Sequence, residues 1–308
     1  MGVKQENIIL ETIKALLHGV SQVLLIENAI SGLIILIACY VAALEVGIAA
    51  TIAVIVGTAT AKGLGMTSDK IKAGLFGFSP VLVGIATVTF IQGRNKWIIV
   101  VIGSIIVTFI TIFINNLLAV WEMPSLTLPF IIITWLVLLA SYQMTTIQTD
   151  LVGMLPQIIE ETGVISNWLD ALTKGIGEVF ILDNVVASLL ILVAIFVAGI
   201  KEGIRVILAI AFSWGFVLIS GMSKDTFAMG LYTYNIILTF LAAGTFLKLT
   251  ARNVGITICG GILTMLLDIV LNVLVAPYGI PILTMPFVLA TFVMLMVAKA
   301  GDNATKCD

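Results

Sequence analysis

Ten apolar runs dominate the sequence, and most are close to the length that a helix needs to cross a bilayer. A transmembrane helix takes about 20 apolar residues, and its backbone hydrogen bonds must all be made internally. The chain is 60% hydrophobic and only 10% charged, whereas a soluble domain carries about 25% charged residues. These features predict an all-α integral membrane protein. The runs lie at about 29–44, 46–63, 73–92, 97–120, 128–147, 182–200, 202–221, 225–246, 252–275 and 283–300.

Charge and side-chain chemistry exclude several classes of protein. The net charge of −2 argues against a nucleic-acid partner. The three cysteines, Cys39, Cys259 and Cys307, are scattered and form neither a metal framework nor a disulfide framework. With His18 as its one histidine, the sequence contains no Ser/His/Asp set and no metal cluster. We therefore expect a protein that is not an enzyme and has no cofactor.

Three motifs occur twice at nearly the same spacing. The first copies are LHGVSQVLLIEN at 17–28, GLFGFSPVL at 74–82 and TLPF at 127–130, and the second copies are TKGIGEVFILDN at 173–184, GLYTYNIIL at 230–238 and TMPF at 284–287. The offset is 156 positions for the first two motifs and 157 for the third. This near-constant offset indicates a duplicated unit of five helices. We expect a first repeat at 1–147, a linker at 148–172 and a second repeat at 173–308.

Basic residues predict the orientation, because cytoplasmic segments carry an excess of Lys and Arg. With the N-terminus inside, eleven basic residues fall in inside segments and four in outside segments. The eleven are Lys4, Lys14, Lys62, Lys70, Lys72, Lys201, Arg205, Lys248, Arg252, Lys299 and Lys306, and the four are Arg94, Lys96, Lys174 and Lys224. We expect a multi-pass protein of the cell membrane with both termini in the cytoplasm. Five helices per repeat then invert the second repeat, and inverted repeats are typical of transporters.

The repeated Thr-x-Pro-Phe pattern supplies the first pair of candidate site residues. Proline suits the first turn of a helix, so Pro129 and Pro286 are expected to begin helices. Thr127 and Thr284 would then lie at or next to the N-cap. The residues before each proline would lie outside the helix, with carbonyl groups free for a solute. An ordinary helix cap explains either motif alone, whereas the symmetric repetition favours two walls of one constriction.

The alignment of the repeats supplies two more pairs. Gln22 pairs with Glu178, and a carboxylate in an apolar run is expected to face water, a partner or a substrate, with a membrane-surface acid as the alternative. Phe78 pairs with Tyr234, and each precedes a leucine by four residues, which puts ring and leucine on one helical face. The two leucines are Leu82 and Leu238. Core packing alone would also explain this third pair.

The doubled motifs resemble those of a known family. GVSQVLLIENAISGLI, GLFGFSPVLVGIA, LTLPF, GIGEVF, GLYTYN and IPILTMPFVLAT are similar to the paired signatures of the urea transporters of bacteria and kidney, over about 17–300. The resemblance implies two inverted five-helix halves with re-entrant or tilted pore helices around a central pore. It also implies a homotrimer in the membrane lipid, with one pore per subunit and passive, channel-like passage of urea.

The resemblance also implies roles for single residues. The implied substrate-binding residues are Gln22, Leu25, Phe78, Leu82, Thr127, Glu178, Val179, Tyr234, Leu238 and Thr284. The chemistry of urea agrees with this set, because urea is planar and neutral and donates hydrogen bonds along two edges. Hydroxyl, amide and carboxylate oxygens would accept from the edges, and apolar side chains would cover the faces. A ladder of acceptors would lower the barrier, since water hydrogen bonds lost without replacement cost several kcal/mol.

Three departures from the family pattern concern the solute. Ser79 stands where the family prefers Asn, Tyr234 stands where Phe is usual, and Leu25 occupies a position that is often aromatic. These changes would alter the width or polarity of the pore. Another short amide, a polyol, ammonia or water therefore remains an alternative solute, although an ammonia channel would need a pair of pore histidines.

An ion-coupled carrier is a further alternative. Such a carrier needs an intramembrane carboxylate, and Asp268 is the one deep candidate, with Glu178 next. The counterpart of Asp268 in the first repeat is Thr111, so this position breaks the symmetry of the pore pairs. We therefore expect Asp268 to make a helix–helix or subunit contact.

Overall fold

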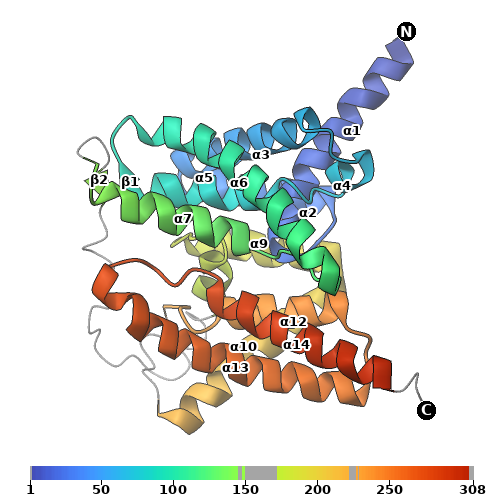
Figure 1. Cartoon of the computed structure of the whole chain (residues 1–308), viewed down its shortest axis with the longest axis vertical. Helices are drawn as coiled ribbons and strands as arrows, with labels where there is room; N and C mark the ends of the chain where they lie inside the picture. The colour runs from blue at the N-terminus through green and yellow to red at the C-terminus, as the bar shows by residue number, and fades with distance from the viewer. Residues whose placement is uncertain (1, 145–147, 150–171, 222–226, 228, 305–308) are drawn as a thin grey trace. The chain divides into compact units, whose positions relative to one another are not determined.

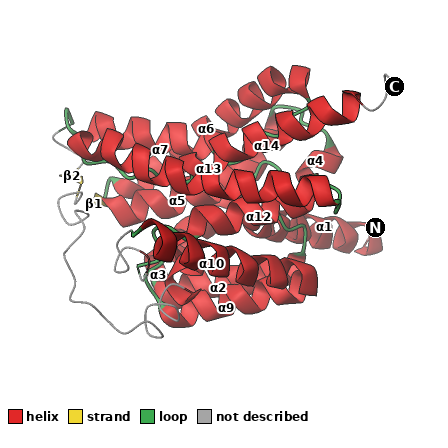
Figure 2. Cartoon of the chain, turned by 90° about the horizontal axis from the view of Figure 1, so that it is seen from below, coloured by secondary structure: helices red, strands yellow, loops and turns green. Residues whose placement is uncertain are grey.

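The computed structural model describes residues 2–144, 148–149, 172–221, 227 and 229–304 (Figure 1). This part of the chain is almost entirely helical, as Figure 2 shows, and its two strands are only two residues long. The strands β1 (Ile91–Gln92) and β2 (Gln148–Thr149) pair antiparallel, with Ile91 opposite Thr149. The expected all-α class is thus confirmed as a mostly helical protein. The predicted linker at 148–172 falls almost wholly outside the described residues.

The chain forms two compact units. Unit 1 comprises Met1–Leu151 and Phe180–Gly199, and unit 2 comprises Val152–Val179 and Ile200–Asp308. The predicted repeats divide the chain differently, because helix α9 (Val185–Ala198), which follows GIGEVF in the second repeat, packs within unit 1. A repeat of sequence need not be a unit of packing, so the repeat boundaries stay a prediction.

Unit 1 is built around the short helix α5. Its helices are α1 (Gly2–Ser21), η1 (Gln22–Leu24), α2 (Ala29–Ala42), α3 (Leu44–Gly63), α4 (Ser68–Lys72), α5 (Phe78–Phe90), α6 (Lys96–Leu118), η2 (Ala119–Trp121), α7 (Leu128–Ser141) and α9 (Val185–Ala198). Helix α5 contains no charged residue and contacts α1, α3, α6 and α7. Every residue of α5 except Thr89 is buried. The phenylalanine that begins this central helix is Phe78, one of the predicted site residues.

Unit 2 has a short central helix of its own. Its described helices are the segment 172–178, α10 (Ile200–Ser220), α12 (Tyr234–Phe246), α13 (Ala251–Val275), η4 (Ala276–Tyr278) and α14 (Met285–Ala304). Helix α12 contacts α10, α13 and α14, and most of its residues are buried. Like α5 it has 13 residues, and it begins with the partner aromatic residue, Tyr234.

Several predicted spans are shorter than expected. In the described chain, four helices are long and apolar enough to cross a membrane alone: Leu44–Gly63, Lys96–Trp121, Ile200–Ser220 and Ala251–Tyr278. Helices α2, α5, α7, α9 and α12 have only 13 or 14 residues. At 1.5 Å per residue they reach roughly 20 Å, which is less than the 30 Å of the hydrocarbon core. Within the described residues, the apolar runs are longer than these helices because turns and loops occupy part of the runs, as at residues 74–77 and 230–233.

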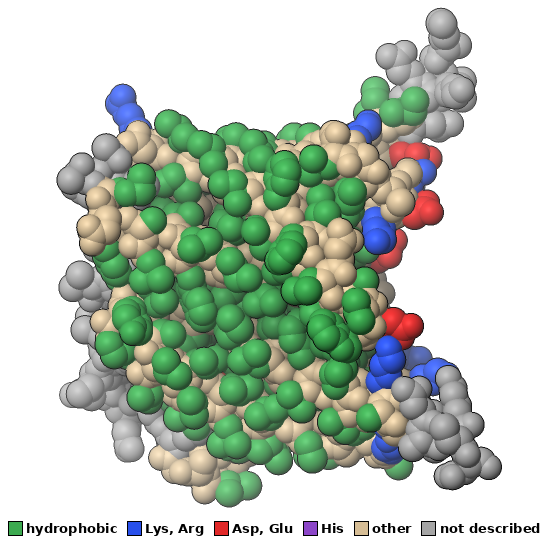
Figure 3. Space-filling model, in the orientation of Figure 1, with side chains coloured by type: hydrophobic (Ala, Val, Ile, Leu, Met, Phe, Trp, Pro, Cys, Tyr) green, Lys and Arg blue, Asp and Glu red, His purple; other side chains and the backbone are tan. Residues whose placement is uncertain are grey.

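The long helices expose apolar stripes. On α6 the exposed large side chains recur every three or four residues, which is the period of one helical face. They include Ile98, Ile102, Ile106, Phe109, Phe113 and Leu117. On α13 the corresponding stripe is Val254, Ile258, Ile262, Leu266, Val270 and Val273. The face in Figure 3 is accordingly mostly hydrophobic, with charged side chains at its margins. Such surfaces suit lipid as the surrounding solvent.

Helices α2 and α9 pack side by side in unit 1 (Figure 2). The Ser31 hydroxyl on α2 donates a hydrogen bond of 2.7 Å to the Ala194 carbonyl on α9. The buried residues are Ser31, Gly32, Ile35, Ala38 and Cys39 on α2 and Ala187, Ser188, Ile191, Ala194 and Ile195 on α9. These two sets are related position by position by the offset of 156. The two helices thus bury equivalent faces.

Unusual backbone conformations recur at the same offsets. Positive φ angles pair Leu25 with Ile181 and Gly74 with Gly230 at an offset of 156, and Leu126 with Leu283 at an offset of 157. Leucine and isoleucine rarely adopt this left-handed region, so each such position has to be held by its surroundings.

Two of the positive-φ glycines also allow backbones to touch. A Cβ on Gly74 would lie 2.4 Å from the Gly19 nitrogen, and one on Gly230 would lie 2.4 Å from the Gly175 nitrogen. We predict that Gly74→Ala and Gly230→Ala each destabilise the protein by about 2–4 kcal/mol, because an unfavourable φ and an overlap with backbone add together. A thermal melt of the detergent-purified protein measures the effect.

Two other glycines serve as controls that separate the effect of the unfavourable φ from the effect of the overlap with backbone. Gly65 and Gly221 have similar φ angles of 75° and 69°, but a Cβ on either would meet nothing within 4 Å. Gly65→Ala and Gly221→Ala should therefore cost only about 1 kcal/mol, from the backbone conformation alone. Equal melting shifts for the tight and the open positions would contradict the predicted close approach.

Candidate functional site

The first candidate residues lie at a break between α1 and α2. The two helices meet at an angle of 75°. Gln22 begins the 3₁₀ turn η1, and Leu25 follows it with φ of 60°, its N–H donating 2.9 Å to the Gln22 carbonyl. The Asn28 side chain then caps α2 by accepting 3.0 Å from the Ser31 N–H. The break therefore satisfies its own backbone groups with local partners.

Side chains of α1 and η1 bond to the segment that leads into α5. Nδ1 of His18 lies 2.8 Å from the Lys72 carbonyl, and the Gln22 amide nitrogen donates 3.0 Å to the Ala73 carbonyl. Gly74 follows directly and touches the α1 backbone. Because the Gln22 nitrogen is engaged, its amide oxygen is the atom suited to accept a hydrogen bond from a solute.

Phe78 and Leu82 lie four residues apart on α5, and both are buried. Helix α5 also contacts α7, whose N-cap is Thr127. Pro129 stands in the first turn of α7 as predicted, and Leu126 before the threonine has φ of 48°.

Thr127 does not act as a side-chain cap, although it occupies the N-cap position and is buried. The Thr127 carbonyl instead accepts 3.1 Å from the Ile131 N–H in the ordinary helical pattern. The cap that the sequence left open for this hydroxyl is thus not formed in the structure.

In unit 2, Glu178 ends the helical segment 172–178 and is half-buried, and Val179 after it is buried. Gly175 in that segment approaches Thr233 and Gly230, just before α12 begins. Tyr234 and Leu238 are buried on α12, four residues apart. The elements that carry the paired residues are therefore arranged alike within each unit.

Thr284 precedes α14, and Pro286 is the second residue of that helix. Thr284 is buried, and its carbonyl accepts 3.1 Å from the Val288 N–H. The residue before it, Leu283, has φ of 52°. This turn repeats the one at Leu126 and Thr127 in unit 1.

The Leu283 carbonyl corrects one expectation from the sequence. The carbonyls before each proline were expected to be free for a solute. The Tyr234 hydroxyl donates 2.7 Å to the Leu283 oxygen, and the Asn235 amide nitrogen lies 3.3 Å from it. Both lone pairs of this carbonyl are therefore engaged. Sequence reasoning missed this because a hydroxyl and an amide on another helix reach the turn from 48 and 49 positions away.

Three residues of structural importance were assigned no role from the sequence: Leu126, Leu283 and Asn235. The doubled Leu-Thr dipeptide before each proline was the available signal for the two leucines. Asp268 on α13 accepts 2.8 Å from Asn235 on α12, and both side chains are fully buried. The expected helix–helix contact of Asp268 is thus confirmed.

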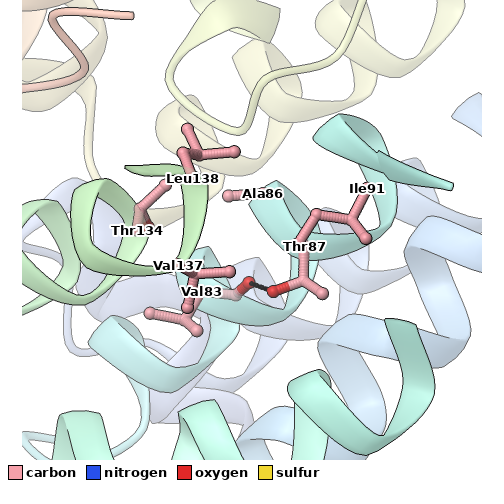
Figure 4. A pocket seen from close by; sticks show the side chains of 7 residues that line it. All are labelled: Val83, Ala86, Thr87, Ile91, Thr134, Val137 and Leu138. Atoms are coloured by element: carbon pink, nitrogen blue, oxygen red, sulfur yellow. Dashed lines mark hydrogen bonds between the residues drawn. The ribbon is translucent and has the colours of Figure 1, made fainter. Parts of the chain in front are cut away.

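A small cavity lies elsewhere in unit 1, between α5 and α7 (Figure 4). Its volume is about 10 Å³, which is at most the space for one water molecule. Its lining residues are Val83, Ala86, Thr87, Ile91, Thr134, Val137 and Leu138. None of the predicted site residues belongs to this lining, and the space is too small for a solute of several heavy atoms.

Comparison with known proteins gives one consistent match. The family model described as urea transporter matches residues 13–299. Urea transporter 1 of Ovis aries and that of Capra hircus are each 26% identical to the chain over 311 residues, covering 96% of this chain and 80% of the relative. Urea transporter 1 of Rattus norvegicus is 26% identical over 314 residues, covering 97% and 80%.

Proposed function

Since the chain belongs to the urea transporter family, we propose that it conducts urea passively across a membrane along a narrow, channel-like path within each subunit. The family consists of transport proteins and not of enzymes. The observation that carries the proposal is a turn that occurs twice, once before α7 and once before α14. In each copy a left-handed leucine precedes a buried threonine, and a proline follows in the first helical turn.

Hydrogen-bond acceptors support urea as the solute. We propose that the hydroxyls of Thr127 and Thr284, the amide oxygen of Gln22 and the carboxylate of Glu178 accept successive hydrogen bonds from the urea N–H groups. Threonine hydroxyls are neutral and weak acceptors, so a solute can leave as readily as it enters, which conduction requires. The burial of both threonines supports their place in a narrow, water-poor section.

Apolar side chains would cover the faces of the solute. We propose that this wall consists of Leu25, Phe78, Leu82, Val179, Tyr234 and Leu238. Helix α5 contacts η1, which carries Gln22, and Tyr234 of α12 bonds to the carbonyl before Thr284, which supports the assignment. The Tyr234 hydroxyl is bound to Leu283, so this tyrosine offers the solute a ring face and not a polar edge.

We further propose that the chain consists of two inverted repeats, with both termini in the cytoplasm of a cell. Repeats related by a two-fold axis bring equivalent surfaces together where they meet that axis. Helices α2 and α9 bury equivalent positions against each other, and this supports the inverted arrangement. The repeated backbone conformations support the same duplication.

Our prediction for assembly is a homotrimer. The reason is the resemblance of the doubled motifs to those of the urea transporters. Native mass spectrometry after release from detergent should give three subunits. A stable monomer with full urea flux would contradict a required trimer.

Passive conduction makes a prediction about driving forces. Urea equilibration into proteoliposomes that contain the purified protein should be unchanged when proton or sodium gradients are collapsed, because a channel-like path couples no ion. Accumulation of urea above its outside concentration would show an ion-coupled carrier instead.

The threonine pair is tested by substitution with valine, which keeps the shape and deletes the hydroxyl. Thr127→Val and Thr284→Val should each raise the barrier to urea by about 1–3 kcal/mol, because one acceptor is lost. Urea flux in proteoliposomes should then fall roughly ten- to hundredfold.

The same helices offer matched controls for this test. Thr134 and Thr291 lie seven residues beyond Thr127 and Thr284, and their buried hydroxyls have no hydrogen-bond partner within the described residues. Thr134→Val and Thr291→Val should leave urea flux near that of the parent. If Thr127→Val and Thr284→Val also conduct like the parent, the two threonines are not part of the path.

A further inference from the structure

A buried polar cluster in unit 2 joins α12, α13 and the turn before α14. The Asn235 amide nitrogen donates 2.8 Å to Oδ1 of Asp268 and lies 3.3 Å from the Leu283 carbonyl. The Tyr234 hydroxyl donates 2.7 Å to that same carbonyl. Asp268 and Asn235 are both 0% exposed. Two side chains of α12 thus reach the carbonyl that precedes Thr284, and α13 is joined to them through Asp268.

Unit 1 has no equivalent cluster among its described residues. Phe78, at the position equivalent to Tyr234, has no hydroxyl, and the Ser79 hydroxyl lacks a hydrogen-bond partner there. Thr111, at the position of Asp268, donates 2.7 Å to the Val107 carbonyl within its own helix. In the described chain, no hydrogen bond is made to the Leu126 carbonyl. The two turns have the same backbone shape but different support.

A buried carboxyl group in a membrane protein is costly and is usually kept for a function. Among the described residues, the side-chain hydrogen bond of Asp268 is made to Asn235, which in turn reaches the Leu283 carbonyl. The left-handed backbone at Leu283 is unfavourable for leucine. Hydrogen bonds to the Leu283 carbonyl fix the orientation of the peptide group that leads directly into Thr284.

We propose that Asp268 is a positioning residue for the solute path. It orients the Asn235 amide, which with the Tyr234 hydroxyl holds the Leu283 peptide group, and the Thr284 hydroxyl is thereby presented in one geometry. This inference rests on the proposed role of Thr284 in the path.

The two halves of the path are then unequal in acceptors. The unit 2 turn offers the solute only the Thr284 hydroxyl, because the Leu283 carbonyl is occupied. The unit 1 turn offers the Leu126 carbonyl besides the Thr127 hydroxyl. Loss of the hydroxyl should therefore reduce flux more at Thr284 than at Thr127.

A double-mutant cycle tests the positioning role. Asp268→Leu removes the acceptor that orients Asn235, and urea flux in proteoliposomes should fall roughly two- to tenfold. Once Thr284→Val has removed the positioned hydroxyl, Asp268→Leu should reduce the flux no further. With Thr127→Val as the second change, the two losses should instead multiply, because Asp268 does not act through that residue. Asp268→Asn keeps an acceptor oxygen and should restore most of the flux.

Thr264→Val is the matched control for loss of a buried polar contact. Thr264 on α13 lies one turn before Asp268, and its hydroxyl is 3.0 Å from that of Thr239 on α12. The substitution removes a hydrogen bond between the same two helices without touching the Leu283 turn. Its effect on flux should be small and independent of Thr284→Val.

The outcomes separate this inference from the proposed function. Multiplying losses for Asp268→Leu and Thr284→Val would overturn the positioning role while leaving the threonine path intact. Parent-like flux in both threonine variants overturns the path and the inference together. If Asp268→Leu does not assemble, the cycle uses Tyr234→Phe, which deletes only the hydroxyl and matches the phenylalanine at Phe78. Tyr234→Phe should reduce urea flux no further when Thr284→Val is present, whereas its loss should multiply with that of Thr127→Val. If the losses of Tyr234→Phe and Thr284→Val multiply, the inference is overturned.

Discussion

The structure depends on hydrogen-bond partners for the backbone N–H and C=O groups at its helix breaks. In hydrocarbon every N–H and C=O without a partner costs several kcal/mol, so a broken helix is tolerated only where local groups take over. At the first break the Leu25 N–H bonds to the Gln22 carbonyl, and the Asn28 side chain caps the next helix. The Asn184 side chain caps α9 by accepting 2.9 Å from the Ala187 N–H. The breaks are thus stable features, and they carry the polar groups that the proposed path uses.

Much of the fold follows from the sequence through two signals. Apolar runs with few charges predicted a helical membrane protein, and the prolines at Pro129 and Pro286 predicted where two helices begin. The four-residue spacing of Phe78 and Leu82 predicted that ring and leucine share one helical face, and both lie four residues apart on α5. These predictions succeed because hydropathy and proline geometry act over a few residues and need no knowledge of distant contacts.

Other features depend on tertiary contacts and could not be predicted from the sequence. Hydropathy does not distinguish an apolar residue in a helix from one in a turn, so it does not indicate the left-handed backbone at Leu126 and Leu283. The bond from Tyr234 to the Leu283 carbonyl joins positions 49 apart. The pairing of α2 with α9 joins segments still further apart. The proposed solute-binding roles themselves rest on family membership and on chemistry.

The burial of α5 and α12 has a consequence for the lipid. A helix that faces the bilayer has to match its apolar length to the hydrocarbon thickness, or else tilt or deform the membrane. Helices α5 and α12 have 13 residues each and are covered mainly by other helices. The lengths of α5 and α12 therefore need not match the thickness of the hydrocarbon core. The longer helices α6 and α13, which expose apolar stripes, have to match it instead. A thicker or thinner bilayer acts first on the outer helices and leaves the two central helices in protein surroundings.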